Sequence, residues 1–313
     1  MSLSQKESFF LKIKEANYFW ILISLILSLF SHVLRAHRWK YLLEPIGYKT
    51  SFWHRYHAMM VGYIMNLTIA RVGEASRAGM LYKTNKVPFA KSFGTIVAER
   101  AVDVLMLGIV FVVAILLRFN DFIVLKKQLI DDNFSKQSSA SNFFSWILIA
   151  LLILFAVGIV ILVMNKKLRN KIKELILHLK DGVLSIFKSK NPLPFIFYSL
   201  CIWILYVGFF AISLYALPEI ASKIPVGGML LTFIGGTIGI IFIQGGIGAY
   251  PIIVGAILTF YAFPDSHSIE PDPAAYALGN IIWVSQTLLM IIMGLISLFY
   301  FSKNFKTKTN ESS

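Results

Sequence analysis

Long apolar segments separated by short polar stretches dominate the chain, and their lengths predict helices that cross a membrane. The hydrocarbon core of a bilayer is about 30 Å thick, so a crossing helix needs about 20 consecutive apolar residues. Residues 52–70 and 93–117 are the weaker candidates, because ionisable side chains interrupt both of them. The candidate segments are residues 17–34, 52–70, 93–117, 143–164, 194–217 and 276–301.

Residues 225–263 form a further apolar stretch, which is long enough for two crossings with almost no turn between them. This stretch holds nine of the twenty glycines and has Pro251 near its middle. Glycine and proline weaken a helix interior, so a broken, re-entrant hairpin is the favoured interpretation. Two glycine-rich helices packed closely together are the alternative.

Composition supports a single integral membrane domain over residues 1–313, with an all-α polytopic fold of about eight crossings. Hydrophobic residues make up 57% of the chain and charged residues 15%, whereas soluble domains carry about 25% charged residues. The lone Cys201 leaves no disulfide framework or zinc site. The formal charge of +14 lies mostly in loops, where anionic lipids account for it and nucleic acid need not be invoked.

Loop charges predict the orientation through the excess of Lys and Arg on the cytoplasmic side. Residues 165–191 carry eight Lys or Arg against two acids, with apolar positions at helical spacing, which predicts a cytoplasmic amphipathic helix. Residues 264–275 are acidic and are expected outside. Eight crossings, with the short tails 1–16 and 302–313 both cytoplasmic, satisfy these loops, and the expected location is a bacterial inner membrane.

One loop disagrees with that topology. Residues 35–41, RAHRWKY, would fall outside despite their three cationic side chains. Two explanations are open: residues 52–70 form a re-entrant pair and the N-terminus is outside, or these cations bind outer-leaflet headgroups.

A cluster of charges follows the second apolar segment. Arg71, Glu74 and Arg77 would share one face of a helix and form a charged ladder. Ionisable groups at membrane depth are expensive unless they are paired, so they usually mark a functional site. Arginine also binds phosphate with two parallel hydrogen bonds, which favours a site for a lipid headgroup. A network of salt bridges that only holds helices together is the structural alternative.

The next segment carries the expected counter-charges. Glu99 and Asp103 are four residues apart and lie on one helical face, with Arg100 turned aside. We expect these two carboxylates to neutralise the arginines across a contact between helices.

A second unusual stretch, IFIQGGIGAYPIIVGA at residues 241–256, lies in the other half of the chain. Interrupted segments at matching positions of two loosely repeated halves indicate a transporter site. Backbone N–H groups freed by Gly245, Gly246 and Gly248 could bind an anionic group, and Gln244 could line the same path.

These stretches resemble the transmembrane part of lysylphosphatidylglycerol synthases and their stand-alone relatives, the flippase-like (YbhN-like, UPF0104) family. The likeness runs from about residue 17 to residue 301 and depends on four short motifs. Matching positions are Arg71, Gly73, Glu74 and Arg77; Glu99, Arg100 and Asp103; Gly245, Gly246 and Gly248; and the pair Arg38 and Trp39, taken as interfacial. The resemblance implies movement of a lipid headgroup between leaflets.

Two departures from the family pattern limit that implication. Many relatives have an acidic residue shortly after the glycine motif, where this chain has Tyr250 and Pro251. The bifunctional members also carry a soluble aminoacyltransferase domain after the membrane part. We therefore expect the translocase activity without the synthase chemistry, and no enzymatic activity.

The leading hypothesis is a lipid flippase or lipid-headgroup transporter without a cofactor. Arg71 and Arg77 would hold the phosphate, and Glu74 would position them or bind a cationic headgroup. Residues 245–248 would line the opposite wall, and Glu99 and Asp103 would set the charge balance. The expected partners are membrane lipids, namely an anionic or aminoacylated phospholipid or a polyprenyl-phosphate lipid, together with a separate lipid-modifying enzyme.

Two other classes of function remain open. A membrane-embedded glycosyl- or phosphotransferase could use Asp131 and Asp132 as a metal-binding pair, although one acidic pair in a polar loop is weak evidence for such a site. A proton-coupled solute carrier could use Glu99 or Asp103, but nearby arginines favour ionised rather than titrating carboxylates.

Overall fold

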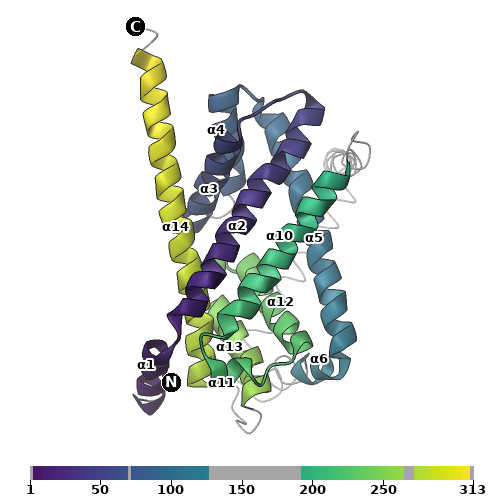
Figure 1. Ribbon diagram of the computed structural model, residues 1–313, viewed down its shortest axis with the longest axis vertical. Helices are drawn as coiled ribbons and strands as arrows, with labels where there is room; N and C mark the ends of the chain where they lie inside the picture. Colours follow the sequence, from purple (N-terminus) through teal and green to yellow (C-terminus); the bar gives the residue numbers. More distant parts are fainter. Residues whose placement is uncertain (1–2, 70–71, 127–191, 264–270, 311–313) are drawn as a thin grey trace, which may run out of the picture.

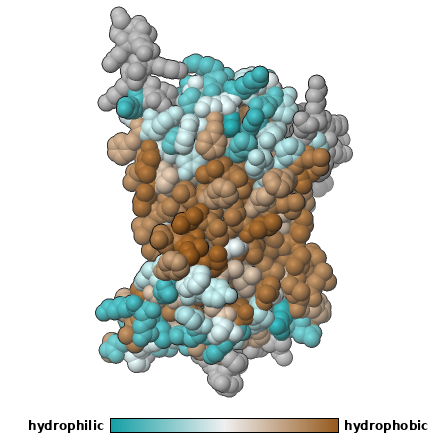
Figure 2. All heavy atoms as spheres, viewed as in Figure 1, coloured by the Kyte–Doolittle hydropathy of each residue, from teal (hydrophilic) through white to brown (hydrophobic). Residues whose placement is uncertain are grey.

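The computed structural model describes residues 3–69, 72–126, 192–263 and 271–310, and these residues form helices and connecting turns without a β-strand. Figure 1 shows an elongated helical bundle, and Figure 2 shows, on the face in view, a broad apolar band across its middle with hydrophilic residues at both ends. This pattern confirms an all-α polytopic membrane protein. The predicted crossing 143–164, the predicted amphipathic helix 165–191 and the acidic pair at residues 131–132 lie outside the described residues.

Four described helices are long and apolar enough to cross a membrane. The shortest has 23 residues, or about 35 Å at 1.5 Å per residue, which exceeds the hydrocarbon thickness. They agree with four segments expected from the sequence; α2, α5 and α14 are longer than the predicted runs, whereas α10 begins two residues earlier and ends three residues earlier than its run. The four are α2 (Tyr18–Leu43), α5 (Phe89–Leu117), α10 (Pro192–Leu214) and α14 (Pro273–Asn310).

Two hairpins of shorter helices complete the bundle. One consists of α3 (Phe52–Thr68) and α4 (Val72–Asn85). The other consists of α12 (Val226–Phe242), the short 3-10 turn η3 (Gln244–Gly246) and α13 (Ala249–Ala262). Their arms have 17 or 14 residues, or about 26 and 21 Å, so each arm is shorter than the hydrocarbon core.

The hairpins enter the bundle from opposite ends. In Figure 1, α3–α4 occupies the upper half and α12–α13 the lower half. Their tips meet where Gln244 Nε2 donates to the carbonyl oxygens of Asn66 and Leu67, both at 3.4 Å. The broken hairpin expected at residues 225–263 is therefore present, and residues 52–70 form one arm of a second hairpin.

Glycine allows the arms of the upper hairpin to pack closely. A Cβ atom on Gly73 would overlap the carbonyl oxygen of Gly62, and one on Gly62 would lie 2.9 Å from the carbonyl oxygen of Gly73. Asn66 Oδ1 accepts a hydrogen bond from the Gly73 N–H at 2.7 Å, which satisfies a backbone donor at the start of α4. This contact fixes where α4 places its charged side chains.

The two ends of the described chain lie at opposite ends of the bundle (Figure 1). The N-terminal helix α1 (Leu3–Glu15) packs against the first turns of α14, with the rings of Phe9 and Tyr276 5.5 Å apart. The other end of α14, near the C-terminus, is 38 residues or about 57 Å away. That both termini are cytoplasmic stays a prediction.

Lys12 anchors α1 to the short helix α11 (Pro218–Ala221). Its Nζ lies 3.0 Å from Glu219 Oε1 and 3.0 Å from Glu15 Oε2. These hydrogen bonds, first with Glu219 and then with Glu15, raise the pKa of the Lys12 amine above its ordinary value. The N-terminal helix is therefore fixed at the end of the bundle opposite to α4.

Candidate functional site

Glu99 is the centre of a buried network of ion pairs. Its Oε1 accepts from Arg35 Nε at 2.7 Å and from an Arg38 terminal nitrogen at 3.0 Å. Its Oε2 accepts from Arg77 at 2.7 Å, and only 1% of the Glu99 side chain is exposed. One carboxylate on α5 therefore joins two guanidinium groups on α2 and one on α4.

Asp103, one turn further along α5, extends the network. It accepts from Arg35 and, at 3.0 Å, from Arg38. A terminal nitrogen of Arg35 also donates to the Tyr206 hydroxyl on α10 at 2.8 Å. The expectation that these two carboxylates neutralise the arginines of residues 71–77 is confirmed for Glu99 with Arg77, whereas Asp103 pairs with the arginines of α2.

Glu74 and Arg100 form the outer part of the site. Arg100 donates to Glu74 Oε1 at 3.1 Å, and Asn66 Nδ2 donates to Glu74 Oε2 at 3.3 Å. Arg100 also lies 3.9 Å from Asp103 Oδ2, and 42% of its side chain is exposed. Arg100 thus belongs to the network instead of being turned aside.

The charged ladder expected along α4 differs from the observed pairing. Glu74 pairs with Arg100 and Arg77 pairs with Glu99, so both side chains of α4 find their partners on α5. Helix packing brings α5 close enough to replace pairing along the helix. Arg71 lies outside the described residues.

Arg38 and Trp39, which were expected to be interfacial, have side chains that are completely buried in the bundle. Trp39 Nε1 donates to Thr95 Oγ1 at 2.9 Å, and its ring lies 3.7 Å from the Arg77 guanidinium carbon. Such stacking stabilises a cation away from water. Helix α2 continues to Leu43, so its last turns pack inside the bundle.

Sequence reasoning missed Arg35 as a member of the site. It was grouped with the cations of a loop after residue 34, whereas it lies on α2 with 4% of its surface exposed. The available signal was its spacing of three residues from Arg38, which places both on one helical face. Tyr206 gave no such signal, because it lies in an uninterrupted apolar segment.

A cavity of about 450 Å³ lies beside this network. That volume is within the range of small-molecule sites, about 300–1,000 Å³. Arg35, Arg100 and Asp103 line one part of it, and Gly245 of the opposing hairpin lines another. Most of the remaining wall is apolar and comes from α5, α10, α12 and α14.

The glycine segment forms the tip of the lower hairpin. Gly245, Gly246 and Gly248 all have positive φ, between 65° and 73°, which side chains other than glycine rarely adopt. The carbonyl oxygen of Gly245 accepts from Trp283 Nε1 at 2.7 Å, whereas the Gly246 N–H donates to Ile243 at 2.7 Å. Among the three glycines, only Gly245 lines the cavity, and Gln244 contacts the facing tip instead.

Three other residues predicted for the site lie behind the wall of the larger cavity. Gly73, Glu74 and Arg77 line a much smaller space of about 10 Å³, which is enough for about one water molecule. Arg100 and Tyr63 border both spaces. Arg77 therefore supports the wall through Glu99 and does not face the larger cavity.

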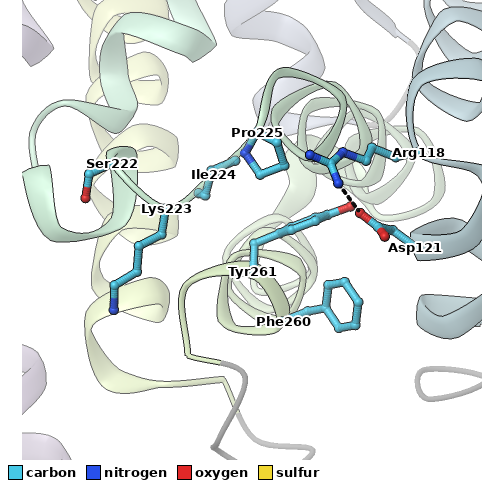
Figure 3. Close-up of a pocket in the computed structure, with 8 residues that line it drawn as sticks. All are labelled: Arg118, Asp121, Ser222, Lys223, Ile224, Pro225, Phe260 and Tyr261. Carbon is cyan, nitrogen blue, oxygen red and sulfur yellow. Dashed lines mark ion pairs between the residues drawn. The ribbon is translucent and has the colours of Figure 1, made fainter.

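A second pocket, of about 490 Å³, opens at the lower end of the bundle (Figure 3). Arg118 pairs with Asp121 at 3.6 Å, while Lys223 points away from them and donates to the Ala262 carbonyl at 2.9 Å. None of the residues singled out in the sequence lines it. In the part of the chain that the structure describes, no group of three or more His, Cys, Asp or Glu side chains could hold a metal ion.

Comparison with known proteins gives one match over most of the chain. A family model described as the lysylphosphatidylglycerol synthase TM region matches residues 2–278. A UPF0104 membrane protein of Methanocaldococcus jannaschii is 31% identical over 87 residues, which cover 27% of this chain and 26% of that protein. The chain thus matches about a quarter of that relative's length, and no solved structure matches.

Proposed function

Since the chain belongs to the family of lysylphosphatidylglycerol synthase transmembrane regions, we propose that it moves a phospholipid or related lipid between leaflets. The supporting observation is the central cavity, which combines a charged wall with extensive apolar walls inside the bundle. A lipid has the same two parts, a polar headgroup and apolar chains.

The rim of the cavity suits lateral entry from the bilayer. Val104 on α5 and Ile241 on α12 line it, and 67% and 57% of their surfaces are exposed. Both side chains are apolar, so acyl chains can remain in contact with them while the headgroup enters.

Arg100 is the best placed group for the phosphate. It is half exposed, and its contacts with Glu74 and Asp103 leave several of its five N–H donors for a ligand. Arg35, by contrast, uses all three nitrogens on Glu99, Asp103 and Tyr206. Arg35 therefore holds the carboxylates in place, while Arg100 binds the headgroup.

The meeting hairpin tips provide the gate. Their hydrogen bonds, from Gln244 to Asn66 and Leu67, are both long at 3.4 Å, so little energy is needed to separate them. Because each hairpin enters from its own end, parting the tips would connect the cavity to both sides. Transport then requires the hairpins to move, while the four long helices remain in place.

The charges at the two ends of the bundle support one orientation. Among the described side chains that are not buried, the upper end in Figure 1 has six Lys or Arg and one acid, whereas the lower end has five Lys or Arg and five acids. The upper end would therefore face the cytoplasm and the N-terminus the outside of the cytoplasmic membrane. This orientation also places residues 35–41 at the cytoplasmic end. The upper residues are Lys40, Lys49, Lys83, Lys86, Lys91 and Lys303, with Glu44.

Reconstitution tests the proposal. Liposomes that contain the purified protein carry phosphatidylglycerol with a label on one acyl chain. Dithionite added outside should then reduce labelled lipid that the protein has moved from the inner to the outer leaflet. Arg100→Gln should slow this movement at least tenfold, because a hydrogen bond to a charged group contributes about 1.5–3 kcal/mol. Lys91→Gln removes an exposed cation from the same helix outside the cavity and should leave the rate unchanged. Equal rates in liposomes with and without protein would refute lipid transport.

A further inference from the structure

We propose that Asn66 is a positioning residue that couples the central cavity to the gate, because it transmits the binding of a phosphate group at Arg100 to the meeting hairpin tips. This inference rests on the proposed function and deepens it by stating how occupancy of the cavity controls the opening of the tips. Asn66 lies in the last turn of α3, next to the tip of its hairpin.

Asn66 contacts both hairpins and the charged network through three different atoms. Its Oδ1 accepts from the Gly73 N–H at 2.7 Å, and its Nδ2 donates to Glu74 Oε2 at 3.3 Å. Its backbone carbonyl oxygen accepts from Gln244 of the opposite hairpin at 3.4 Å. This carbonyl is available because α3 ends at Thr68, and the last four carbonyl groups of a helix have no partner within it.

A continuous series of polar contacts joins Asn66 to the cavity. Arg100, on the cavity wall, donates to Glu74 Oε1 at 3.1 Å, while the other oxygen of Glu74 accepts from Asn66. Asn66 and Glu74 line the small space of about 10 Å³ behind the wall, whereas Arg100 borders both spaces. A phosphate in the cavity can therefore contact Arg100 directly, and its effect on Asn66 passes through Glu74.

A phosphate group competes with Glu74 for the N–H donors of Arg100. Arginine binds phosphate through two parallel hydrogen bonds, whereas Glu74 receives one bond from Arg100 among the described contacts. Occupancy of the cavity therefore draws the guanidinium toward the phosphate. Glu74 must then either follow Arg100 or rely on its bond with Asn66, and in both cases the amide of Asn66 is displaced.

The packing of the upper hairpin passes this displacement on to the tips. A Cβ atom on Gly73 would overlap the carbonyl oxygen of Gly62, so the two arms have no slack between them. Because its Oδ1 is bound to Gly73, the Asn66 amide cannot shift without the last turn of α3. The bonds from Gln244 are 3.4 Å long, beyond the usual range of about 2.7–3.2 Å, so a small shift breaks them. A filled cavity thus favours separated tips, and an empty one favours joined tips.

Two substitutions and their combination test this route. Asn66→Asp keeps an oxygen for the Gly73 N–H but replaces the donor toward Glu74 by a like charge. Glu74→Gln has one amide oxygen, which cannot take the place of two carboxylate oxygens toward Arg100 and Asn66. The combination restores both bonds, because the glutamine donates to the new carboxylate and still accepts from Arg100. It also has the formal charge of wild type.

The readout is the distance between the tips in full-length protein in dodecyl maltoside, measured by double electron–electron resonance. Spin labels are attached to cysteines that replace Thr68 and Ile247, both exposed at the tips, in a background without Cys201. In this parent protein, dioleoyl phosphatidylglycerol should raise the ratio of separated to joined tips at least about fivefold, as expected for coupled sites. Dioleoylglycerol, which has the same acyl chains and no phosphate, should leave the ratio unchanged.

The variants should change this response in a defined order. Asn66→Asp and Glu74→Gln should each reduce it to less than about twofold, below the usual range for coupled sites. The combination should recover the response of the parent protein. Asn85→Asp is the matched control, because it makes the same chemical change at the other end of α4, and it should keep the full response.

Three results would overturn the inference. An undiminished response in Asn66→Asp would assign the opening to direct contact of the lipid with Leu67 and Gly245, which also line the cavity. An equal effect of dioleoylglycerol would remove the role of the phosphate. Loss of the response in the combination, although it keeps the wild-type thermal midpoint, would refute the hydrogen-bonded route. Should Asn66→Asp fail to fold, Glu74→Gln and the combination still decide the question.

Failure of this inference can be distinguished from failure of the proposed function. If labelled lipid moves in liposomes at the same rate with Asn66→Asp as with wild type, transport stands and the coupling is refuted. If phosphatidylglycerol separates the tips through Asn66 but no lipid moves in liposomes, the coupling stands and transport is refuted.

Discussion

Replacing Glu99 by glutamine should destabilise the bundle strongly while hardly changing the shape of the side chain. Glu99 binds Arg35, Arg38 and Arg77 by hydrogen bonds of 2.7–3.0 Å in a buried position. Asp103 still pairs with the two arginines of α2 in the variant, but Arg77 loses the one carboxylate that it contacts among the described residues. Breaking a buried pair by removing one partner costs about 3–5 kcal/mol, because a charge is left uncompensated.

The assay is the thermal stability of detergent-purified protein, measured by size-exclusion chromatography after heating. At about 2–4 °C per kcal/mol, Glu99→Gln should lower the midpoint by roughly 6–20 °C. Glu74→Gln is the matched control. It also removes one carboxylate, but its partner Arg100 is half exposed, so the change should stay within about 1 kcal/mol.

A second substitution tests the cause. If the unpaired guanidinium of Arg77 is responsible, adding Arg77→Leu to Glu99→Gln should recover part of the lost stability. A midpoint for Glu99→Gln equal to that of Glu74→Gln would refute the idea that this network holds the helices together. If the double variant is less stable than the summed losses of the two single variants predict, the loss of stability comes from packing and not from charge.

Three further changes test the hairpins and the orientation. Gly73→Ala should prevent the protein from accumulating in a folded form, as measured by chromatography, because the new methyl group overlaps the facing backbone. The control Gly79→Ala should be tolerated, because the methyl group meets open space there. Cysteines replacing Gln244 and Leu67, in a background without the native cysteine, should form a disulfide that stops lipid movement until reductant is added; transport by the crosslinked protein would refute the gate. A cysteine replacing Lys86 should react with an impermeant maleimide only from the cytoplasmic side, and labelling from outside would reverse the proposed orientation.

The class of fold and several parts of the site could be predicted because they depend on local patterns. Apolar length identified the four long helices, and the spacing of Glu99 and Asp103 placed them on one face of α5. The glycine motif predicted the break at residues 245–248, where positive φ values are observed.

Other features depend on contacts between distant segments, which no local pattern specifies. The tip contact joins Gln244 to Asn66 across 178 residues. The role of Arg35 became evident only because α2 extends past the apolar run and packs against α5 and α10. The pairing of α3 with α4 in one hairpin is a related case, since an apolar arm of a hairpin has the composition of a crossing helix but returns to the same end.

The buried network also constrains how the protein is made. On insertion scales, each charged residue in the middle of a helix adds up to about 3 kcal/mol to the free energy of entering the membrane. Helix α2 carries Arg35 and Arg38, and α5 carries Glu99, Arg100 and Asp103, so the charged part of each helix adds a cost when the helix inserts alone. Because their charges cancel only on contact, the first helices must stay beside the insertion machinery until α5 has been synthesised. The first five helices are therefore expected to insert into the membrane together.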